Sequence, residues 1–310
     1  MSASTSSSPL VWLITGTSSG FGTHLVSSVL ARGDRVIATA RSLDSIKHLE
    51  SNPNVCTRQL DVTSGVPALS EIISEAVKVW GRIDVVVNNA GVGYHGIMEE
   101  GGSSLLQKNF AVNFFGVMDV CAACLPHLRA QKSGTIVVVS SRSAWKCEIP
   151  VSFVLLDSRS AHDLTSSLTE LLHTGSYASS KAAVSALTQT LAVELAPFGV
   201  RVLLIEPGGF RTDILRQEYH TSNPIADYDE MRGASKKLFA GVYGMEKGDP
   251  AKAMEALVDV VRGEGPAEGR PWPGHLVLGE DADTDVRKKC QKVVENLDGW
   301  AHIARGVSFD

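Results

Sequence analysis

Short apolar runs alternate with longer amphipathic segments, and this alternation restricts the fold more than any other feature. Strand-like runs rich in Val, Ile and Leu occupy residues 10–15, 35–40, 83–89, 134–141 and 200–207, with weaker candidates at 55–62 and 275–279. Helical patterns lie between them at 20–32, 64–80, 103–131 and 176–197. Nearly continuous apolar strands suit a sheet buried on both faces, and strands that alternate with helices indicate parallel pairing. The sequence therefore predicts an α/β fold with a Rossmann-type, doubly wound parallel sheet.

The domain boundaries follow from where this pattern starts and stops. No linker divides the strand-rich region, so one domain over residues 9–300 is expected, with a disordered tail at 1–8 and a C-terminal tail at 301–310. From residue 213 to about 274 the pattern changes to helices and Gly/Pro turns. We expect this region to form a small helical cap on the substrate side.

Composition and charge exclude several classes of function. With 29 basic and 34 acidic residues the net charge is −5, and no basic tract indicates nucleic-acid binding. No stretch approaches the roughly 18 continuous apolar residues of a membrane span. Neither the nine histidines nor the five cysteines show metal-ligand spacing, so no metal is expected. An odd cysteine count without a framework and an N-terminus without a leader pattern favour a cytoplasmic protein with reduced thiols.

A glycine-rich turn joins the first strand to the first helix. The turn reads TGTSSGFG, in which Gly16, Gly20 and Gly22 allow a tight bend and a close approach of the backbone to a pyrophosphate at the helix N-terminus. A glycine turn alone is weak evidence, but strand, turn and helix follow in the required order. The candidate cofactor contacts in this turn are Gly16, Thr17, Ser18, Ser19, Gly20, Phe21 and Gly22.

The end of the second strand indicates which dinucleotide is bound. An NAD site usually has a carboxylate here for the ribose 2′-hydroxyl, whereas this chain has Ala40 followed by Arg41. A guanidinium pairs well with a phosphate, so NADP(H) is expected in preference to NAD(H). The alternative is that Arg41 is a solvated surface residue. Asp61 is a candidate for the adenine amine, or else a cap for the following helix.

Several motifs together resemble the short-chain dehydrogenase/reductase family. They are TGTSSGFG, LDVT (60–63), NNAG (88–91), Asn113 in FAVNFFG, Ser141 after IVVVS, YASSK (177–181) and PGG (207–209), in the family's order over about residues 10–215. The glycine spacing resembles the short, non-extended subgroup. VWLITGTSSGFG and HLVLGEDA are also similar to microbial members that reduce lipophilic ketones.

The resemblance implies a role for each matched residue. Tyr177 would be the general acid/base, Lys181 one helical turn later would favour its phenolate, and Ser141 would hydrogen-bond the substrate oxygen. Asn113 would use its carbonyl to hold a water that leads to the lysine. Further cofactor contacts implied by the family are Asp61, Val62, Asn89, Ala90, Gly91, Asn113, Tyr177, Lys181, Pro207, Gly208 and Thr212.

One spacing departs from the family pattern. Ser141 and Tyr177 are 36 positions apart instead of about a dozen, and removing a block of about 23 residues at 151–173 restores ordinary spacing. The block is either a genuine loop, with an amphipathic helix at 161–173 over the substrate cleft, or a retained intron. It lies beside the active site, and a displacement of about 1 Å there can lower the rate a hundredfold.

The main hypothesis is an NADP(H)-dependent oxidoreductase that reduces a small lipophilic ketone or aldehyde, or oxidises the matching secondary alcohol. The alternative is a catalytically impaired dinucleotide-binding sensor or scaffold; a sugar-nucleotide epimerase is weakened by the glycine spacing. A homodimer or homotetramer is expected, because helices 103–131 and 176–197 match the family's subunit contacts. Candidate pocket residues are Phe210, Ile214, Leu215, Tyr219 and Tyr228.

Overall fold

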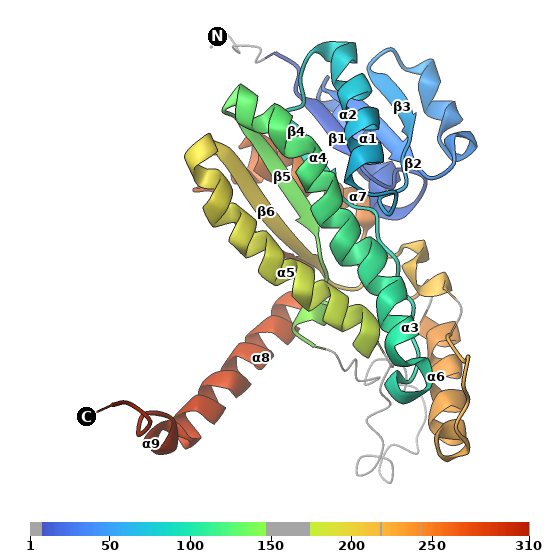
Figure 1. Ribbon diagram of the computed structural model, residues 1–310, viewed down its shortest axis with the longest axis vertical. Coiled ribbons are helices and arrows are strands. Elements are labelled where there is room, and N and C mark those ends of the chain that lie inside the picture. The colour runs from blue at the N-terminus through green and yellow to red at the C-terminus, as the bar shows by residue number, and fades with distance from the viewer. Residues whose placement is uncertain (1–7, 147–173, 218, 243, 310) are drawn as a thin grey trace.

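The computed structural model describes residues 8–146, 174–217, 219–242 and 244–309, and within them the chain forms one seven-stranded sheet (Figure 1). The strand order is β3-β2-β1-β4-β5-β6-β7, and every neighbouring pair is parallel. This is the doubly wound order: β2 and β3 are added on one side of β1, and β4 to β7 are added on the other side. The predicted fold class is therefore confirmed. The strands are β1 Val11–Ile14, β2 Arg35–Ala40, β3 Val55–Gln59, β4 Val85–Asn88, β5 Gly134–Val139, β6 Val200–Pro207 and β7 His275–Leu278.

Helices cover both faces of the sheet and create two hydrophobic cores. On one face α1 (Gly20–Ala31) and α7 (Pro250–Arg262) pack over side chains such as Trp12 and Val85. On the other, nearer the viewer in Figure 1, α2 (Val66–Trp80), α4 (Gly116–Gln131) and α5 (Gly175–Leu195) pack over side chains such as Leu13 and Val86. Because successive strand residues point to opposite faces, a continuous apolar strand supplies both cores at once.

The helix expected at 103–131 is longer and is not continuous. It begins as α3 (Met98–Phe110), passes through a π-helical turn at Ala111–Phe115 and continues as α4. Gly102, with φ of 51°, interrupts the helical conformation near its start. The run Met98–Gln131 is also the one helix among the described residues that is long and apolar enough to cross a membrane, and half of its apolar window is buried inside the protein.

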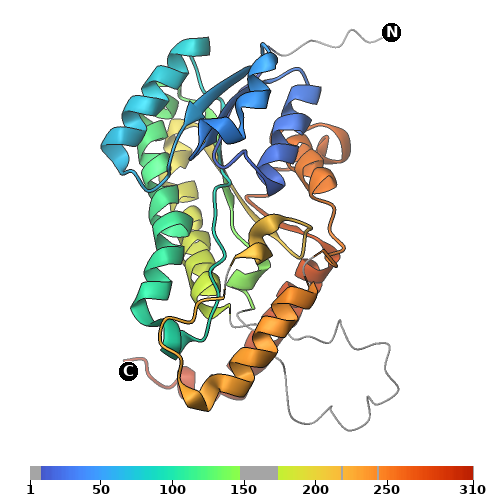
Figure 2. The ribbon, with the colours of Figure 1, turned by 90° about the vertical axis from the view of Figure 1, so that its right-hand side faces the viewer.

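The region expected to be a substrate cap divides into two parts. Residues up to about 248 lie outside the sheet and include α6 (Asp229–Val242), shown in orange below the sheet in Figure 2. The next helix, α7, instead belongs to the core, because Met254, Leu257 and Val258 are fully buried against the sheet. The cap is therefore shorter than the predicted 213–274, because α7 packs against the sheet.

The C-terminal region is helical where a tail was expected from residue 301. Helix α8 (Glu280–Gly299) leaves the body after β7 and projects from it, and the short α9 (Ala301–Ala304) follows (Figure 1). Single turns of 3-10 helix complete the elements at Leu43–Ser45, Lys47–Ser51, Arg142–Ala144, Ala196–Phe198, Asp213–Arg216, Ala226–Tyr228 and Gly265–Ala267. The expected insertion at 151–173 lies outside the described residues.

Candidate active site

Ser141, Tyr177 and Lys181 meet at the carboxyl end of β5 despite their separation in sequence. Ser141 begins the 3-10 turn that follows β5, where its Oγ accepts a hydrogen bond from the Ser143 amide at 3.1 Å. Tyr177 lies in the first turn of α5, with its hydroxyl close enough to the Ser141 side chain for that side chain to favour the phenolate. Lys181, four residues later on the same helix face, places Nζ 5.8 Å from the centre of the Tyr177 ring.

Burial determines the proton affinities of this pair. The Lys181 side chain is buried and its Nζ donates to the Val139 carbonyl oxygen at 2.8 Å. Loss of hydration lowers the pKa of Lys181 to about 8. Burial likewise raises the pKa of Tyr177 to about 12, although the hydrogen bond from Ser141 favours the phenolate. In the protein alone, desolvation therefore outweighs the effect of Ser141, and the pKa of Tyr177 lies above its usual value near 10.

Asn113 is tied to the same helix by its side-chain amide. It lies in the π-helical turn, fully buried. Its Nδ2 donates to Ser180 Oγ at 3.0 Å, and Ser180 Oγ donates to the Tyr177 carbonyl at 2.7 Å. Its Oδ1 accepts from the Val92 amide at 2.9 Å. The side-chain carbonyl therefore fixes the loop after NNAG, and the expected role of Asn113 in holding a water stays a prediction.

The glycine-rich turn and the NNAG segment are joined directly. Asn89 Nδ2 donates to the carbonyl oxygens of Thr15 and Gly16, both at 2.9 Å, and the Ala90 amide donates to Thr15 Oγ1 at 3.0 Å. Gly16, at φ of 71°, has no room for a side chain, because a Cβ there would lie 2.9 Å from the Ala90 backbone. These contacts bring the two predicted cofactor segments to one edge of the sheet.

The residues at this edge fit a dinucleotide. Helix α1 begins at Gly20 with no side-chain cap and no acidic residue in its first turn, so its first amide groups are available to an anion. Ser18 and Ser19 are exposed beside them. Residues from the PGG segment close the other side: a Cβ on Gly20 would touch Thr212 at 3.5 Å, and the rings of Phe21 and Phe210 lie 5.3 Å apart. Pro207 ends β6 and Gly208 follows it directly.

The residues expected at the adenosine end lie at neighbouring strand ends. Arg41 follows β2 directly and its side chain is exposed. Asp61 is also exposed, but its Oδ1 accepts from the amide and hydroxyl of Thr63 at 2.9 and 2.8 Å. It thus stabilises its own turn, and the alternative that it caps the next helix is wrong, because α2 begins only at Val66. Val62 is buried against Gly116.

An ion-pair cluster that the sequence did not reveal supports the Ser141 loop. Arg142 Nη1 lies 2.8 Å from Asp281 and 3.0 Å from Asp285, and Lys146 Nζ lies 2.7 Å from Asp285. Asp281 also accepts from the Gly209 amide at 2.8 Å. The first turn of α8 therefore joins the loop after Ser141 to the PGG turn. The contacting residues lie 72 or more positions apart, so no local pattern indicated the contacts.

A second missed residue, Glu206, is fully buried behind the site near the end of β6. Its Oε1 accepts from Ser185 Oγ at 2.7 Å, and its Oε2 lies 2.8 Å from His275 Nε2 and accepts from the Trp145 indole. Ser185 Oγ in turn lies 2.9 Å from Ser140 Oγ. The carboxylate raises the pKa of His275 through its hydrogen bond. The sequence offered one sign that Glu206 is buried, because it is a charged residue within the otherwise apolar run LLIEP.

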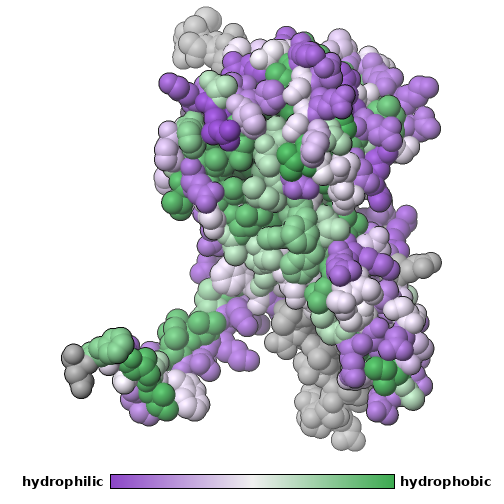
Figure 3. Space-filling model, viewed as in Figure 1, coloured by the Kyte–Doolittle hydropathy of each residue, from purple (hydrophilic) through white to green (hydrophobic). Residues whose placement is uncertain are grey.

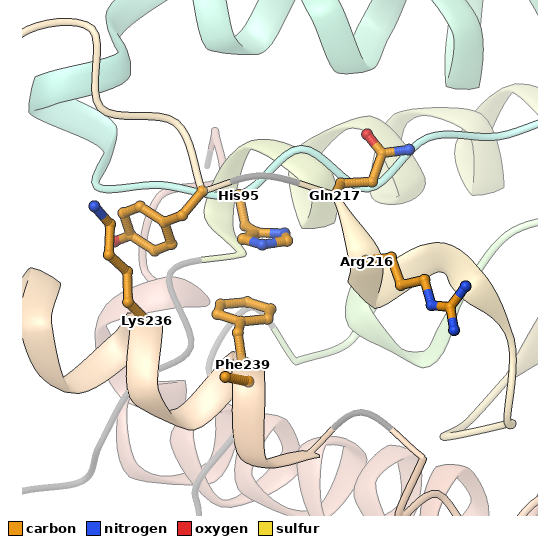
Figure 4. A pocket seen from close by; sticks show the side chains of 7 residues that line it. His95, Arg216, Gln217, Lys236 and Phe239 are labelled. Carbon is orange, nitrogen blue, oxygen red and sulfur yellow. The ribbon is translucent and has the colours of Figure 1, made fainter.

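A cavity of about 330 Å³ opens between the loop after NNAG and the cap (Figure 4). The ring of His95 stacks on that of Phe239, with centres 3.8 Å apart, and Lys236 and Gln217 lie around this stack. Arg216 extends away from the rings. The loop that carries His95 also contacts α5, because the carbonyl oxygen of the preceding residue, Tyr94, accepts a hydrogen bond from Ser176 Oγ at 3.1 Å.

Of the residues predicted for the pocket, Tyr219 lines this cavity, and the others are not among its lining residues. Phe210 packs on Phe21, and the Tyr228 hydroxyl donates to Glu99 at 2.7 Å. Ile214 lies against Gly93. The side chain of Leu215 lies outside the described residues. His95 and Phe239 were missed, because a lone histidine and a helix phenylalanine carry no motif.

The profile of the short chain dehydrogenase family matches residues 10–152 and 165–223 of this chain, and the unmatched residues 153–164 fall inside the predicted insertion. An oxidoreductase of Botryotinia fuckeliana, BOA17, is 31% identical over 95% of this chain and 97% of its own length. The uncharacterized oxidoreductase C162.03 of Schizosaccharomyces pombe is 29% identical over 96% and 91%. A crystal structure of a short-chain dehydrogenase from Streptomyces avermitilis, 31% identical, superposes with a TM-score of 0.78 over 97% of this chain and all of that one. The chain therefore belongs to the short-chain dehydrogenase family of oxidoreductases.

Proposed function

We propose that this protein is an NADP(H)-dependent oxidoreductase that interconverts a small lipophilic ketone or aldehyde and the matching alcohol, with Tyr177 as general acid/base. The observation that carries the proposal is that the Ser141 side chain, the Tyr177 hydroxyl and the buried ammonium of Lys181 lie together at the carboxyl end of β5. A hydroxyl donor, a phenol and a cation at one strand end form a site that can bind a carbonyl oxygen and protonate it.

The residues of the chain supply the proton chemistry. A nicotinamide held here would supply the hydride for reduction of the carbonyl carbon. In that direction the Tyr177 hydroxyl gives its proton to the carbonyl oxygen. Ser141 Oγ stabilises the negative charge that develops on that oxygen. The phenolate left on Tyr177 is stabilised by the ammonium of Lys181, which among the described residues donates to the Val139 carbonyl oxygen and pairs with no carboxylate. In the oxidising direction the same phenolate removes the alcohol proton.

The cofactor preference rests on the end of β2. Arg41 is exposed there, directly after the buried Ala40, and no carboxylate occupies the position that would repel a 2′-phosphate. The glycine turn, Asn89 and the PGG turn would hold the remainder of the dinucleotide. An arginine is well suited to this position because its planar guanidinium binds two phosphate oxygens at once.

The substrate and the setting are part of the same proposal. The aromatic rings of His95, Tyr219 and Phe239 around the cavity favour a lipophilic carbonyl compound. Free thiols at Cys56, Cys121, Cys124 and Cys290 are consistent with a cytoplasmic protein. For the homo-oligomer, Figure 3 shows apolar residues gathered over the α4–α5 face. Val193 on α5 is 76% exposed.

Replacing Tyr177 tests the proposal. We expect Tyr177→Phe to lower kcat for NADPH-dependent ketone reduction by about a thousandfold, since general acid catalysis contributes about 10²–10⁴-fold. Binding of NADPH, followed by its fluorescence, should be kept. Tyr228→Phe is the matched control, because its hydroxyl bonds only the surface carboxylate of Glu99. A wild-type protein that binds NADPH but reduces none of a panel of aliphatic and aromatic ketones would support the sensor alternative instead.

A further inference from the structure

The C-terminal helix carries an apolar stripe, most of which the described part of the body leaves uncovered. Val286, Cys290, Val293, Leu297 and Trp300 follow one another in steps of four, three, four and three residues. That spacing is the heptad repeat of a helix that packs against another helix. Residues 287–300 are all exposed, and Leu297 and Trp300 retain 61% and 59% of their surface. Figure 3 shows green stretches on the projecting arm, separate from the α4–α5 face.

The arm is fixed at its root, so this stripe is held away from the body. Asp281 and Asp285 in the first two turns pair with Arg142 and Lys146, and Ala282 is fully buried. Beyond Asp285 the helix continues to Gly299, which corresponds to about 21 Å of free helix at 1.5 Å per residue. A helix this short is marginally stable alone in water, and an apolar face on a projecting arm indicates a contact partner.

The charges on the free part of the arm indicate what that partner is. Arg287, Lys288, Lys289 and Lys292 form a basic segment, and Glu295 and Asp298 form an acidic one after it. Two such helices side by side in parallel would place basic beside basic. In the antiparallel arrangement the basic segment of each lies beside the acidic segment of the other, and the helix dipoles are also opposed favourably.

We propose that α8 is a self-association arm that packs antiparallel against the α8 arm of a second copy of this chain, through Val286, Cys290, Val293, Leu297 and Trp300. The dyad lies near Val293 and Val294, which brings Cys290 of one arm across from Leu297 of the other. This contact is distinct from the α4–α5 face. Because the arm root holds both the loop after Ser141 and the PGG turn, the paired arms also support the active site.

The mass of the full-length protein in solution tests this arm. Leu297→Lys and, separately, Val293→Lys place a charge in the stripe, whereas Gln291→Lys adds the same charge on the opposite, exposed face of the helix. Light scattering is expected to show that the two stripe variants halve the mass of the wild-type assembly and that Gln291→Lys does not. Equal thermal unfolding midpoints would show that the body remains folded. An unchanged mass in the stripe variants, or a monomeric wild type, overturns the proposal.

Two further measurements separate the alternatives. Under mild oxidation, Leu297→Cys should form a cross-linked dimer that is lost in the double variant Cys290→Ser/Leu297→Cys. Cross-linking of the wild type through Cys290 alone would instead show a parallel pair and contradict the antiparallel arrangement. If the stripe variants keep their mass but no longer sediment with phosphatidylserine vesicles, the stripe binds a membrane surface, and the proposal of a second copy is wrong.

Discussion

Glu206 is the residue whose replacement tests the buried network most directly, and Glu206→Gln is the mildest change. The carboxylate accepts hydrogen bonds from Ser185 and Trp145 and pairs with His275, and it has no exposed surface. A glutamine has one acceptor oxygen, so its amide group would meet an N–H or O–H donor. One donor left without an acceptor costs about 1–3 kcal/mol, and loss of the negative charge weakens the remaining bonds. We expect the free energy of unfolding to fall by about 3 kcal/mol in total.

The pH dependence of this loss has a definite sign. The pKa of His275 is raised in the folded protein, chiefly by its hydrogen bond to Glu206. A raised pKa contributes stability that is complete below the unfolded value, near 6.5, and is lost as the pH rises through the folded value. The difference between wild type and Glu206→Gln should therefore be larger at pH 6 than at pH 8. His275 is 37% exposed in its side chain, so solvent screening keeps this difference modest.

Urea denaturation followed by tryptophan fluorescence is the assay, because the Trp145 indole itself donates to Glu206. Glu264→Gln is the matched control: Glu264 also pairs with arginines, but its side chain is 37% exposed, so a loss below about 1 kcal/mol is expected. If Glu206→Gln costs no more than Glu264→Gln, or if its cost rises between pH 6 and pH 8, the reasoning about the buried carboxylate is wrong.

Two shorter predictions concern the cofactor and the late tyrosine. Arg41→Ala should raise the KM for NADPH about tenfold and leave the KM for NADH unchanged, because an exposed charge-assisted contact is worth about 1.5 kcal/mol. The control is Lys47→Ala, which removes another exposed cation close in sequence. Equal effects of Arg41→Ala on both cofactors would contradict the assignment. Deletion of residues 151–173 should keep kcat within tenfold of the full chain, and a hundredfold loss, the size expected of about 1 Å of misplacement, would show that the segment positions the site.

The sequence predicted the sheet well and placed Tyr177 and Lys181 close together, for physical reasons. A strand buried on both faces must be apolar at nearly every position, so runs such as Val137–Val139 stand out without a structure. Tyr177 and Lys181 are neighbours on one helix, so their spacing alone places them together.

Contacts between distant residues were not predictable in the same way. The pairs that Arg142 makes with Asp281 and Asp285 join a loop and a helix start that share no local pattern. Glu206 was overlooked because a carboxylate in a strand usually faces solvent, and only the structure shows the donors that surround it. The arm was missed for another reason: its heptad spacing is interrupted by many charges, so the segment has the composition of a tail.

The late position of Tyr177 is tolerated because the two sides of the site are anchored independently. Ser141 follows a central strand, and its loop is held by Arg142 and Lys146 on α8 and by Trp145 on Glu206. The start of α5 has its own contacts: Ser176 Oγ bonds to Tyr94, and Ser180 Oγ accepts from Asn113. Each of these partners lies outside residues 147–173. The distance between the two hydroxyls is therefore determined by the sheet and by α3, α4 and α8, and the number of residues that connect them has little influence on it. A family site normally built within about a dozen residues can thus be kept with 36.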